Sequence, residues 1–391
     1  MASDTDFVRL QQLLRDQGLE EACDFLVDRL KQRKQFEQLF DARLMQCRHR
    51  LGLPVLDNRD LDQIPATVRD QLEEQYVAVC REVGQLLLDE GAFRRAWMYL
   101  RPAGEHEVMK SALARALPDE QNLEELIELS IYEGVDPGRG FQWMLEHHGT
   151  CNSITAYESA MYGRDLAQRQ LVAGILVKWL HKELLNNLVP EGEPGPAGTD
   201  SQGPIETLLA QHGGADETFG EFVTHIDVSH LTTVVRFARI ITDPSVLRVA
   251  VDLSAYGTHL HESLQPSADP PFDDYFPAHR LFYAAQLGRE VDPAVEYFRT
   301  RAEATDLTVD SVVPIEVYVA LLDRLARYGD AVRARAQLLP PDIQTTGFAP
   351  TLVELSRRAG NYEFLLGQCQ QRDDLLGYAI GQLHRYDGDR E

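Results

Sequence analysis

The chain has 391 residues, and 44% of them are hydrophobic, which is enough to bury a sizeable core. Asp and Glu number 62 against 38 Lys and Arg, so the formal charge is −24. This charge opposes non-specific attraction to nucleic-acid phosphates and to anionic membrane surfaces. We therefore expect neither a nucleic acid nor a membrane as a partner.

Cysteine usage and the N-terminus predict a cytoplasmic protein. The five cysteines are odd in number, lie far apart and include no CxxC pair that would suggest a zinc knuckle or a redox dithiol. The first residues, MASDTDFVRLQQ, contain no basic region followed by an apolar run. Apolar stretches such as 171–180 are too short to span a bilayer.

Residues 5–50 are predicted to form two or three amphipathic helices that end before the Gly52–Pro54 break. Residues 66–103 then predict two helices in close antiparallel contact. In this hairpin Gly84 would let the second backbone approach, and Gly91 could take the left-handed turn conformation. The second helix carries an apolar stripe at helical spacing, formed by Phe93, Ala96, Leu100 and Ala103.

The stretch 77–103, VAVCREVGQLLLDEGAFRRAWMYLRPA, resembles one tetratricopeptide unit, a helix–turn–helix repeat in which small residues of the two helices face each other. Five positions carry this resemblance: Gly84, Gly91, Phe93, Ala96 and Ala103. Cys80 stands where the family usually has Trp, and the proline expected after the unit is displaced to Pro102. Weaker echoes of the second half occur at irregular spacing, at 34–40, 291–298, 328–336 and 360–366. The resemblance implies an irregular stack of hairpins rather than a uniform array.

Two helices are predicted next. A helix rich in Leu and Glu covers 119–133, and Asp136 followed by Pro137 should start another that runs to about His148 and stops at Gly149. The stretch 147–155, HHGTCNSIT, allows two interpretations. Cys151 beside two histidines could form a nucleophile–base pair, but we favour a plain helix stop followed by a cap from Thr150, Asn152 or Ser153.

Residues 164–188 predict the strongest single helix, with a broad apolar face. The segment 189–204, VPEGEPGPAGTDSQGP, is rich in Pro and Gly and has almost no large apolar group, so we predict that it is disordered. It is either a linker between two domains or a long loop between stacked helices. Helical hairpins resume over 205–391, with capping signals at Asp243–Pro244 and Asp292–Pro293.

Histidine is concentrated in the middle of the chain. Nine of the twelve fall in one window: His147, His148, His181, His212, His225, His230, His259, His261 and His279. Residues 229–242 and 244–258 read as two helices joined by a short turn, which makes them antiparallel neighbours. The end of the second helix would then return beside the start of the first.

This geometry would bring His225 and His230 close to His259 and His261, with Asp227 and Glu262 in the same neighbourhood. Imidazole and carboxylate groups suit zinc or another divalent metal, and a neutral histidine could also act as an acid or base. The plainer interpretation is that Asp227 or Ser229 caps a helix and the histidines are half-exposed polar residues. The spacing matches no established metal motif.

A proline-rich and aromatic run, 265–288, also allows two interpretations. Asp269, Asp273 and Asp274 with His279 could crowd a metal or a polar ligand. We favour packing, in which the prolines guide a loop back over the helices and three aromatic side chains fill their grooves, namely Phe272, Tyr275 and Phe276.

The sequence thus predicts an all-α fold, an irregular right-handed stack of antiparallel helical hairpins similar to tetratricopeptide proteins, with regions 1–188 and 205–391 flanking the 189–204 segment. No phosphate-binding loop or serine-hydrolase motif is present, and we expect no cofactor. Binding of another protein or an extended peptide is the leading function. The alternatives are a metal-dependent or histidine-based enzyme at the 225–262 hairpin end, and a purely structural subunit.

Overall fold

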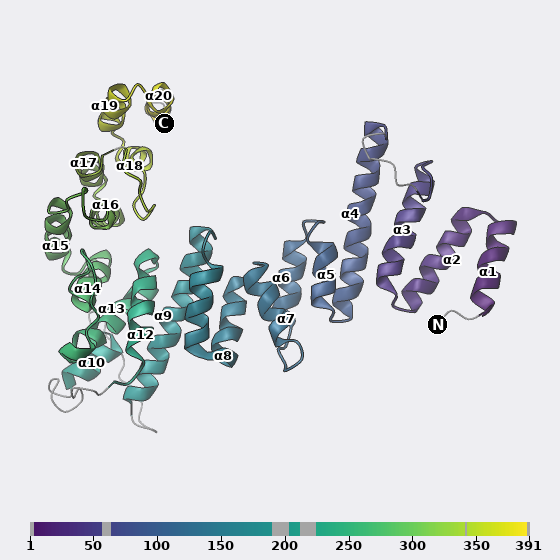
Figure 1. Ribbon diagram of the computed structural model, residues 1–391, viewed down its shortest axis with the longest axis horizontal. Helices are drawn as coiled ribbons and strands as arrows, with labels where there is room; N and C mark the ends of the chain where they lie inside the picture. The colour runs from purple at the N-terminus through teal and green to yellow at the C-terminus, as the bar shows by residue number, and fades with distance from the viewer. Residues whose placement is uncertain (1–3, 57–63, 190–202, 212–223, 341, 389–391) are drawn as a thin grey trace. The chain divides into compact units, whose positions relative to one another are not determined.

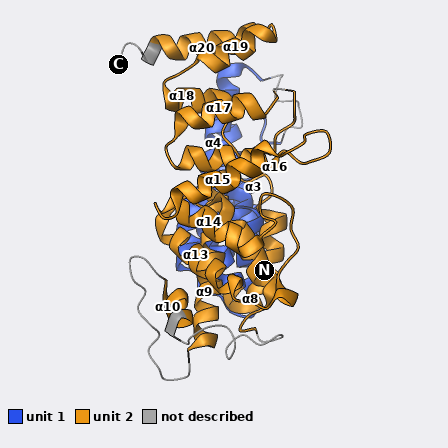
Figure 2. Ribbon diagram, turned by 90° about the vertical axis from the view of Figure 1, so that its left-hand side faces the viewer, with its two compact units in different colours: residues 1–144 blue, residues 145–391 orange. Residues whose placement is uncertain are grey.

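The computed structural model describes residues 4–56, 64–189, 203–211, 224–340 and 342–388. Within these ranges every regular element is helical and none is a strand, so the predicted all-α fold is confirmed (Figure 1). No helix in the described part of the chain is both long and apolar enough to cross a membrane. Two compact units, 1–144 and 145–391, divide the chain, and the division falls inside a helix, α8 (Figure 2).

In the first unit each helix packs against the next along the chain, from α1 to α6. Its elements are α1 (Asp4–Asp16), α2 (Leu19–Gln32), α3 (Phe36–Arg50), α4 (Ala66–Asp89), α5 (Phe93–Leu100), α6 (His106–Arg115), α7 (Leu123–Ile127) and the π-helical turn η2 (Glu128–Tyr132). The predicted helices over 5–50 are therefore three, and the last ends before the Gly52 break as expected.

The close crossing predicted for the 66–103 hairpin is present between α4 and α5. A Cβ atom added to Gly84 would lie 2.6 Å from side-chain atoms of Leu100 and 3.5 Å from the Ala96 carbonyl oxygen. Ala96 is completely buried, and Gly91 turns the chain with φ of 73°. The small residues thus sit where the backbones meet, although the nearest side chain to Gly84 belongs to Leu100.

The single helix predicted over 119–133 is replaced by shorter elements. The Asp119 carboxylate accepts hydrogen bonds from the backbone N–H groups of Gln121 and Asn122, a turn that delays the start of α7 to Leu123. The helix then widens into η2. Gly140 packs against this turn so closely that a Cβ atom there would lie 2.5 Å from Ile131 Cγ1.

The second unit contains the elements from the latter part of α8 onward. They are α8 (Pro137–Ala160), α9 (Leu166–Leu188), α10 (Pro204–Gln211), α12 (Val228–Phe237), the 3-10 turn η3 (Ala238–Ile240), α13 (Pro244–Thr258), the 3-10 turn η4 (Glu262–Leu264), α14 (Tyr275–Gln286), α15 (Val291–Glu303), α16 (Val313–Arg324), α17 (Tyr328–Leu338), α18 (Leu352–Ala359), α19 (Glu363–Gln371) and α20 (Leu375–Gly388). From α13 onward each helix packs against its successor.

The predicted break at Gly149 is a kink inside α8, where this glycine has φ of 79°. The helix resumes at once, and none of the three expected residues caps it. Thr150 instead donates to Glu183 at 3.0 Å, while Asn152 and Ser153 donate to carbonyl oxygens of the preceding turn. The contacts of Asn152 and Ser153 are typical of a helix interior, where a side chain donates to the carbonyl oxygen one turn earlier.

Most of the 189–204 segment, residues 190–202, lies outside the described residues. The helices on its two sides can nevertheless be compared. α9, which precedes the segment, packs against α12 and α13, which follow it. These three helices therefore belong to one compact unit.

Candidate functional site

The 225–262 hairpin end has the antiparallel geometry that the sequence predicts. The backbone N–H of His225 donates to the hydroxyl of Tyr256 at 2.9 Å, and the ring Nδ1 lies 3.1 Å from the same oxygen. The start of α12 therefore lies beside the end of α13. Burial lowers the pKa of His225 below its usual value, which favours the neutral ring.

Asp227 acts as the N-cap of α12. Its Oδ1 accepts hydrogen bonds from the backbone N–H of Ser229 at 2.7 Å and from the Ser229 hydroxyl at 2.6 Å. A longer bond of 3.4 Å comes from the backbone N–H of His230. The pKa of Asp227 is lowered, mainly by the hydrogen bond from the Ser229 side chain. This is the plainer of the two interpretations weighed for this residue.

The two histidines that follow α13 also have local contacts. His259 Nδ1 lies 2.9 Å from the carbonyl oxygen of Ala255, one turn earlier in α13. His261 Nδ1 accepts from the backbone N–H of Ser263 at 3.2 Å and so caps η4. Across the described residues, no group of three or more His, Cys, Asp and Glu side chains is arranged to hold a metal ion. Of the predicted ligands, His225 is thus placed beside α13 through Tyr256, Asp227 caps α12 and His261 caps η4.

A buried carboxylate that the sequence analysis missed lies in the same helix. Asp252 is 1% exposed, and its Oδ2 is 2.7 Å from Nε2 of His181. Its two oxygens also accept the backbone N–H groups of Ile205 and Glu206, at 3.0 and 2.9 Å. Asp252 thus fastens the start of α10 to α13. An aspartate inside the apolar run VAVDLSAY was the available signal, because an acidic side chain is rarely buried without partners.

The proline-rich run packs against the helices, as favoured. Phe272, Tyr275 and Phe276 are all buried. Asp273 pairs with Arg301 through two hydrogen bonds of 2.7 and 2.9 Å, so its carboxylate is directed to a cation of α15.

His279 has no role beside these aspartates, because it is fully buried in the aromatic core of the second unit. Its Nε2 accepts a hydrogen bond from Nε of Arg239 at 2.7 Å, and its ring stacks on Phe272 with centroids 4.1 Å apart. Nδ1 donates to the Tyr275 carbonyl oxygen at 2.7 Å. Burial, and then the Arg239 charge, hold the pKa of His279 well below its usual value of 6.5.

The most chemically distinctive surface feature is a cavity of about 570 Å³ in the second unit, which we call the arginine pocket. It is lined by the start of α9, the end of η3, α16, α18 and the loop before α18. Its lining residues are Leu166, Arg169, Gln170, Ile240, Thr242, Ala320, Asp323, Arg324, Thr346, Gly347, Phe348, Pro350 and Arg358. The volume falls in the range typical of ligand pockets, and basic groups dominate its charge.

Arg324 is held firmly in the wall of this pocket. Its Nη1 donates to the carbonyl oxygen of Arg239 at 2.7 Å and to Gln286 Oε1 at 3.2 Å. The guanidinium carbon lies 5.3 Å from the ring centroid of Phe282 and 5.4 Å from that of Phe348. Burial lowers the pKa of Arg324 to about 10, so the group remains a cation at neutral pH.

The carboxylate of the neighbouring residue, Asp323, has only part of its hydrogen-bonding capacity filled by described residues. Its Oδ2 pairs with Nη1 of Arg358, but its buried Oδ1 has no hydrogen-bond partner among the described residues. The side chain is 10% exposed. An unpaired carboxylate oxygen at this depth has an unfavourable desolvation cost, which a donor group would offset.

A buried glutamate fastens the loop that closes the pocket. Glu316 is completely buried, and Oε2 accepts from the backbone N–H of Thr346 at 3.0 Å and from its hydroxyl. Oε1 accepts from the backbone N–H of Gly347 at 3.2 Å. This loop therefore has a fixed backbone at the point where it lines the pocket.

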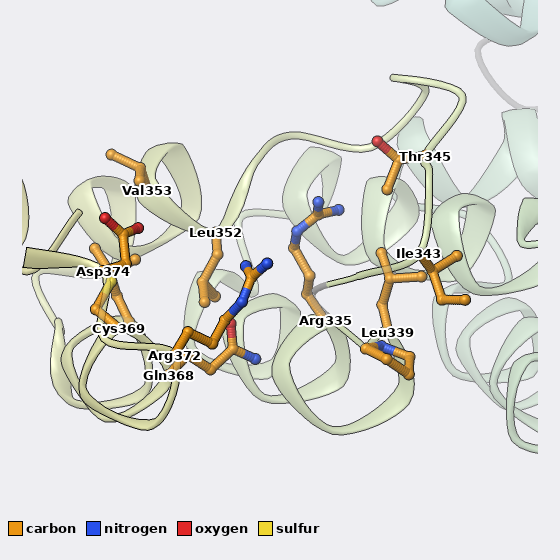
Figure 3. Close-up of a pocket in the computed structure, with 12 residues that line it drawn as sticks. Arg335, Leu339, Ile343, Thr345, Leu352, Val353, Gln368, Cys369, Arg372 and Asp374 are labelled. Carbon is orange, nitrogen blue, oxygen red and sulfur yellow. The ribbon is translucent and has the colours of Figure 1, made fainter. Parts of the chain in front are cut away.

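The same loop and α18 line a second cavity of about 190 Å³, which we call the C-terminal pocket (Figure 3). Arg335 and Arg372 extend toward the same side of this cavity. Arg372 pairs with Asp342 at 3.0 Å, whereas Nη1 of Arg335 is buried without a hydrogen-bond partner. Burial lowers the pKa of Arg335. The two pockets thus share one loop, and each is lined by its own arginines.

The cysteine considered as a nucleophile offers no such arrangement. Cys151 is exposed on α8, and its thiol makes no hydrogen bond with a described residue. The other four cysteines are buried, and burial raises the pKa of each thiol, as Cys23 illustrates.

Comparison with known proteins gives no match: no family model, no curated protein and no solved structure matches this chain.

Proposed function

We propose that this chain is a helical-repeat binding module that holds an extended segment of a partner protein at the arginine pocket. Stacks of helical hairpins offer grooves between successive helices, and such grooves commonly receive peptides. The observation that carries the proposal is the cavity of about 570 Å³, whose walls come from three helices and a loop fastened by Glu316.

The lining of the pocket suits a polypeptide. Exposed Leu166 and the loop residues Phe348 and Pro350 provide apolar contacts beside charged groups. The C-terminal pocket is lined by the same loop. One extended segment can therefore place one side chain in the arginine pocket and another in the C-terminal pocket. Apolar contacts joined to a few fixed polar groups are the usual composition of a recognition site.

The alternative of an enzyme at the 225–262 hairpin end has less support. Asp227 and His261 each serve as a helix cap, and His225 bonds to Tyr256. These contacts use Nδ1 of the two histidines and Oδ1 of Asp227, and no group of three or more His, Cys, Asp and Glu side chains in the described part of the chain is arranged to hold zinc or another metal.

Selection from a random peptide display library tests the proposal. Leu166 lines the pocket and is 55% exposed, while Leu171 lies on the same helix with the same exposure but outside the pocket. Replacing Leu166 with Trp fills the pocket, and Leu171→Trp is the matched control. We expect selected peptides to bind the wild type and the control equally, and the Leu166→Trp variant at least tenfold more weakly. Failure to select any peptide, or equal binding to both variants, would contradict the proposal.

A further inference from the structure

The arginine pocket has a local charge opposite to that of the chain. Three arginines and one aspartate line it, although the formal charge of the whole chain is −24. Arg358 is paired with Asp323. Arg169 and Arg324 have no carboxylate partner among the described residues, so two cations remain for a ligand.

We propose that the pocket recognises an acidic segment, with Arg169 and Arg324 binding an Asp or Glu side chain and Asp323 accepting a backbone N–H of the same segment. This inference rests on the proposed function and names the chemistry of the partner. An arginine binds a carboxylate through paired N–H donors, which makes the contact directional as well as attractive.

Arg324 is prepared for this contact by its surroundings. Only its Nη1 hydrogen-bonds to described residues, and both acceptors are neutral oxygens, from Arg239 and Gln286. The flanking rings of Phe282 and Phe348 restrict the guanidinium, so little further ordering is needed when a ligand binds. A ligand carboxylate would compensate the buried positive charge.

Arg169 offers a second cation on the α9 side of the pocket. Its side chain lies beside the hydroxyl of Tyr157, a neutral partner that leaves its charge uncompensated. A carboxylate placed between Arg169 and Arg324 would contact α9 and α16 at once. This arrangement favours an acidic ligand over a basic one by direct charge complementarity.

The carboxylate of Asp323 favours a peptide over a simple anion as the ligand. Its buried Oδ1 lacks a donor, and inorganic phosphate or a small dicarboxylate would bring further negative charge toward it. A peptide instead supplies a backbone N–H next to its acidic side chain. A nucleic acid is opposed by the charge of −24 over the chain.

Fluorescence anisotropy with labelled octapeptides tests the inference directly. Three peptides alternate Ala with Glu, Gln or Lys, and the full chain is titrated into each. We expect the Glu peptide to bind more tightly than the other two, although the charge of the chain alone favours the Lys peptide. Arg169→Gln should weaken binding of the Glu peptide at least fivefold, with an unchanged circular dichroism spectrum. Preference for the Lys peptide, or no effect of Arg169→Gln, would overturn the inference.

A charge series at exposed Leu166 keeps the test independent of folding. Binding of the Glu peptide should strengthen with Leu166→Lys and weaken with Leu166→Glu, whereas the same changes at Leu171 should have less than half the effect. Equal effects at both positions would show general surface electrostatics and overturn the inference.

Three further results separate the possible failures. Selected peptides that depend on Leu166 but contain no enrichment of Asp or Glu would overturn the acidic partner and leave the binding function standing. Absence of any pocket-dependent peptide would overturn both. Inorganic phosphate or a single-stranded oligonucleotide that binds more tightly than the Glu peptide, and depends on Arg169, would replace the peptide by a phosphate ligand.

Discussion

The interiors of the two units are held together by different means. In the described part of the first unit no charged side chain is buried, and its core consists of apolar residues, cysteines and the close crossing at Gly84, with Gln46 and Ser130 as buried polar residues. Among the described residues of the second unit, two carboxylates and one histidine are buried, namely Asp252, Glu316 and His279. Each of these has at least two hydrogen-bond partners.

The difference shows what buried polar groups contribute in this protein. Asp252 accepts backbone N–H groups at the start of α10, and Glu316 accepts them from the loop before α18. Apolar packing positions helices, but it provides little restraint on an irregular loop, whose backbone donors need specific acceptors. The loop fixed by Glu316 is also the one that lines the arginine pocket.

Removal of the Glu316 carboxylate should have the largest effect on stability. In Glu316→Ala the N–H groups of Thr346 and Gly347 lose their acceptors, and we expect the free energy of unfolding to fall by about 3 kcal/mol. Urea denaturation measures this change. Glu296→Ala, at an exposed position on α15, is the control and should change stability far less. Equal losses in both variants would mean that the buried carboxylate of Glu316 contributes no more to stability than an exposed one.

The close crossing in the first unit predicts whether an alanine at Gly84 stabilises or destabilises the fold. Gly→Ala in an open helix position stabilises by up to about 1 kcal/mol, but at Gly84 the new Cβ would overlap Leu100, and we expect destabilisation by about 2 kcal/mol. Gly367, in α19, has no atom within 4 Å of an added Cβ, so Gly367→Ala should be stabilising. Thermal unfolding monitored by circular dichroism compares the two. Stabilisation by Gly84→Ala would mean that the crossing is looser than described.

His279 makes the second unit sensitive to acid. Because its pKa in the folded state lies well below 6.5, the unfolded chain binds more protons as the pH falls below 6.5. The folded state therefore loses stability from this residue by up to about 1.4 kcal/mol between pH 6.5 and 5.5. This contribution is fully present above pH 6.5. Urea denaturation of the wild type and of His279→Gln at both pH values measures this loss of stability. We expect the variant to lose less stability than the wild type on acidification, and an equal loss would contradict a buried neutral histidine.

The histidines of the hairpin end should have the smallest effects. His230→Ala and His259→Ala are each expected to change the free energy of unfolding by less than about 0.5 kcal/mol, since their contacts are local. Zinc titration followed by calorimetry completes the test. Stoichiometric zinc binding that both substitutions abolish, with helicity retained, would restore the metal interpretation.

Local sequence signals predicted much of the fold. Gly91 marked a turn, Gly149 a kink and Asp243 with Pro244 a helix start, and in each case the conformation depends on residues within a few positions. The Asp292–Pro293 signal was less accurate, because α15 begins at Val291, one residue before the expected cap.

The candidate site was much harder to predict. Arg324 bonds to the backbone of Arg239, 85 residues earlier, and Glu316 reaches a loop about 30 residues later. Periodicity reports only contacts within one element and its neighbours, so it gives no sign of these pairs. The histidine cluster was predicted because it is visible in the sequence, whereas the arginines that line a common cavity are scattered along 190 residues.

Hydrogen–deuterium exchange with and without a selected peptide tests the central claim most directly. If a partner segment binds at the arginine pocket, exchange should slow at the start of α9, in the loop 345–350 and in α18. The first unit should remain unchanged, as should the 225–262 hairpin end. Protection confined to the first unit or to that hairpin end would contradict the proposed site.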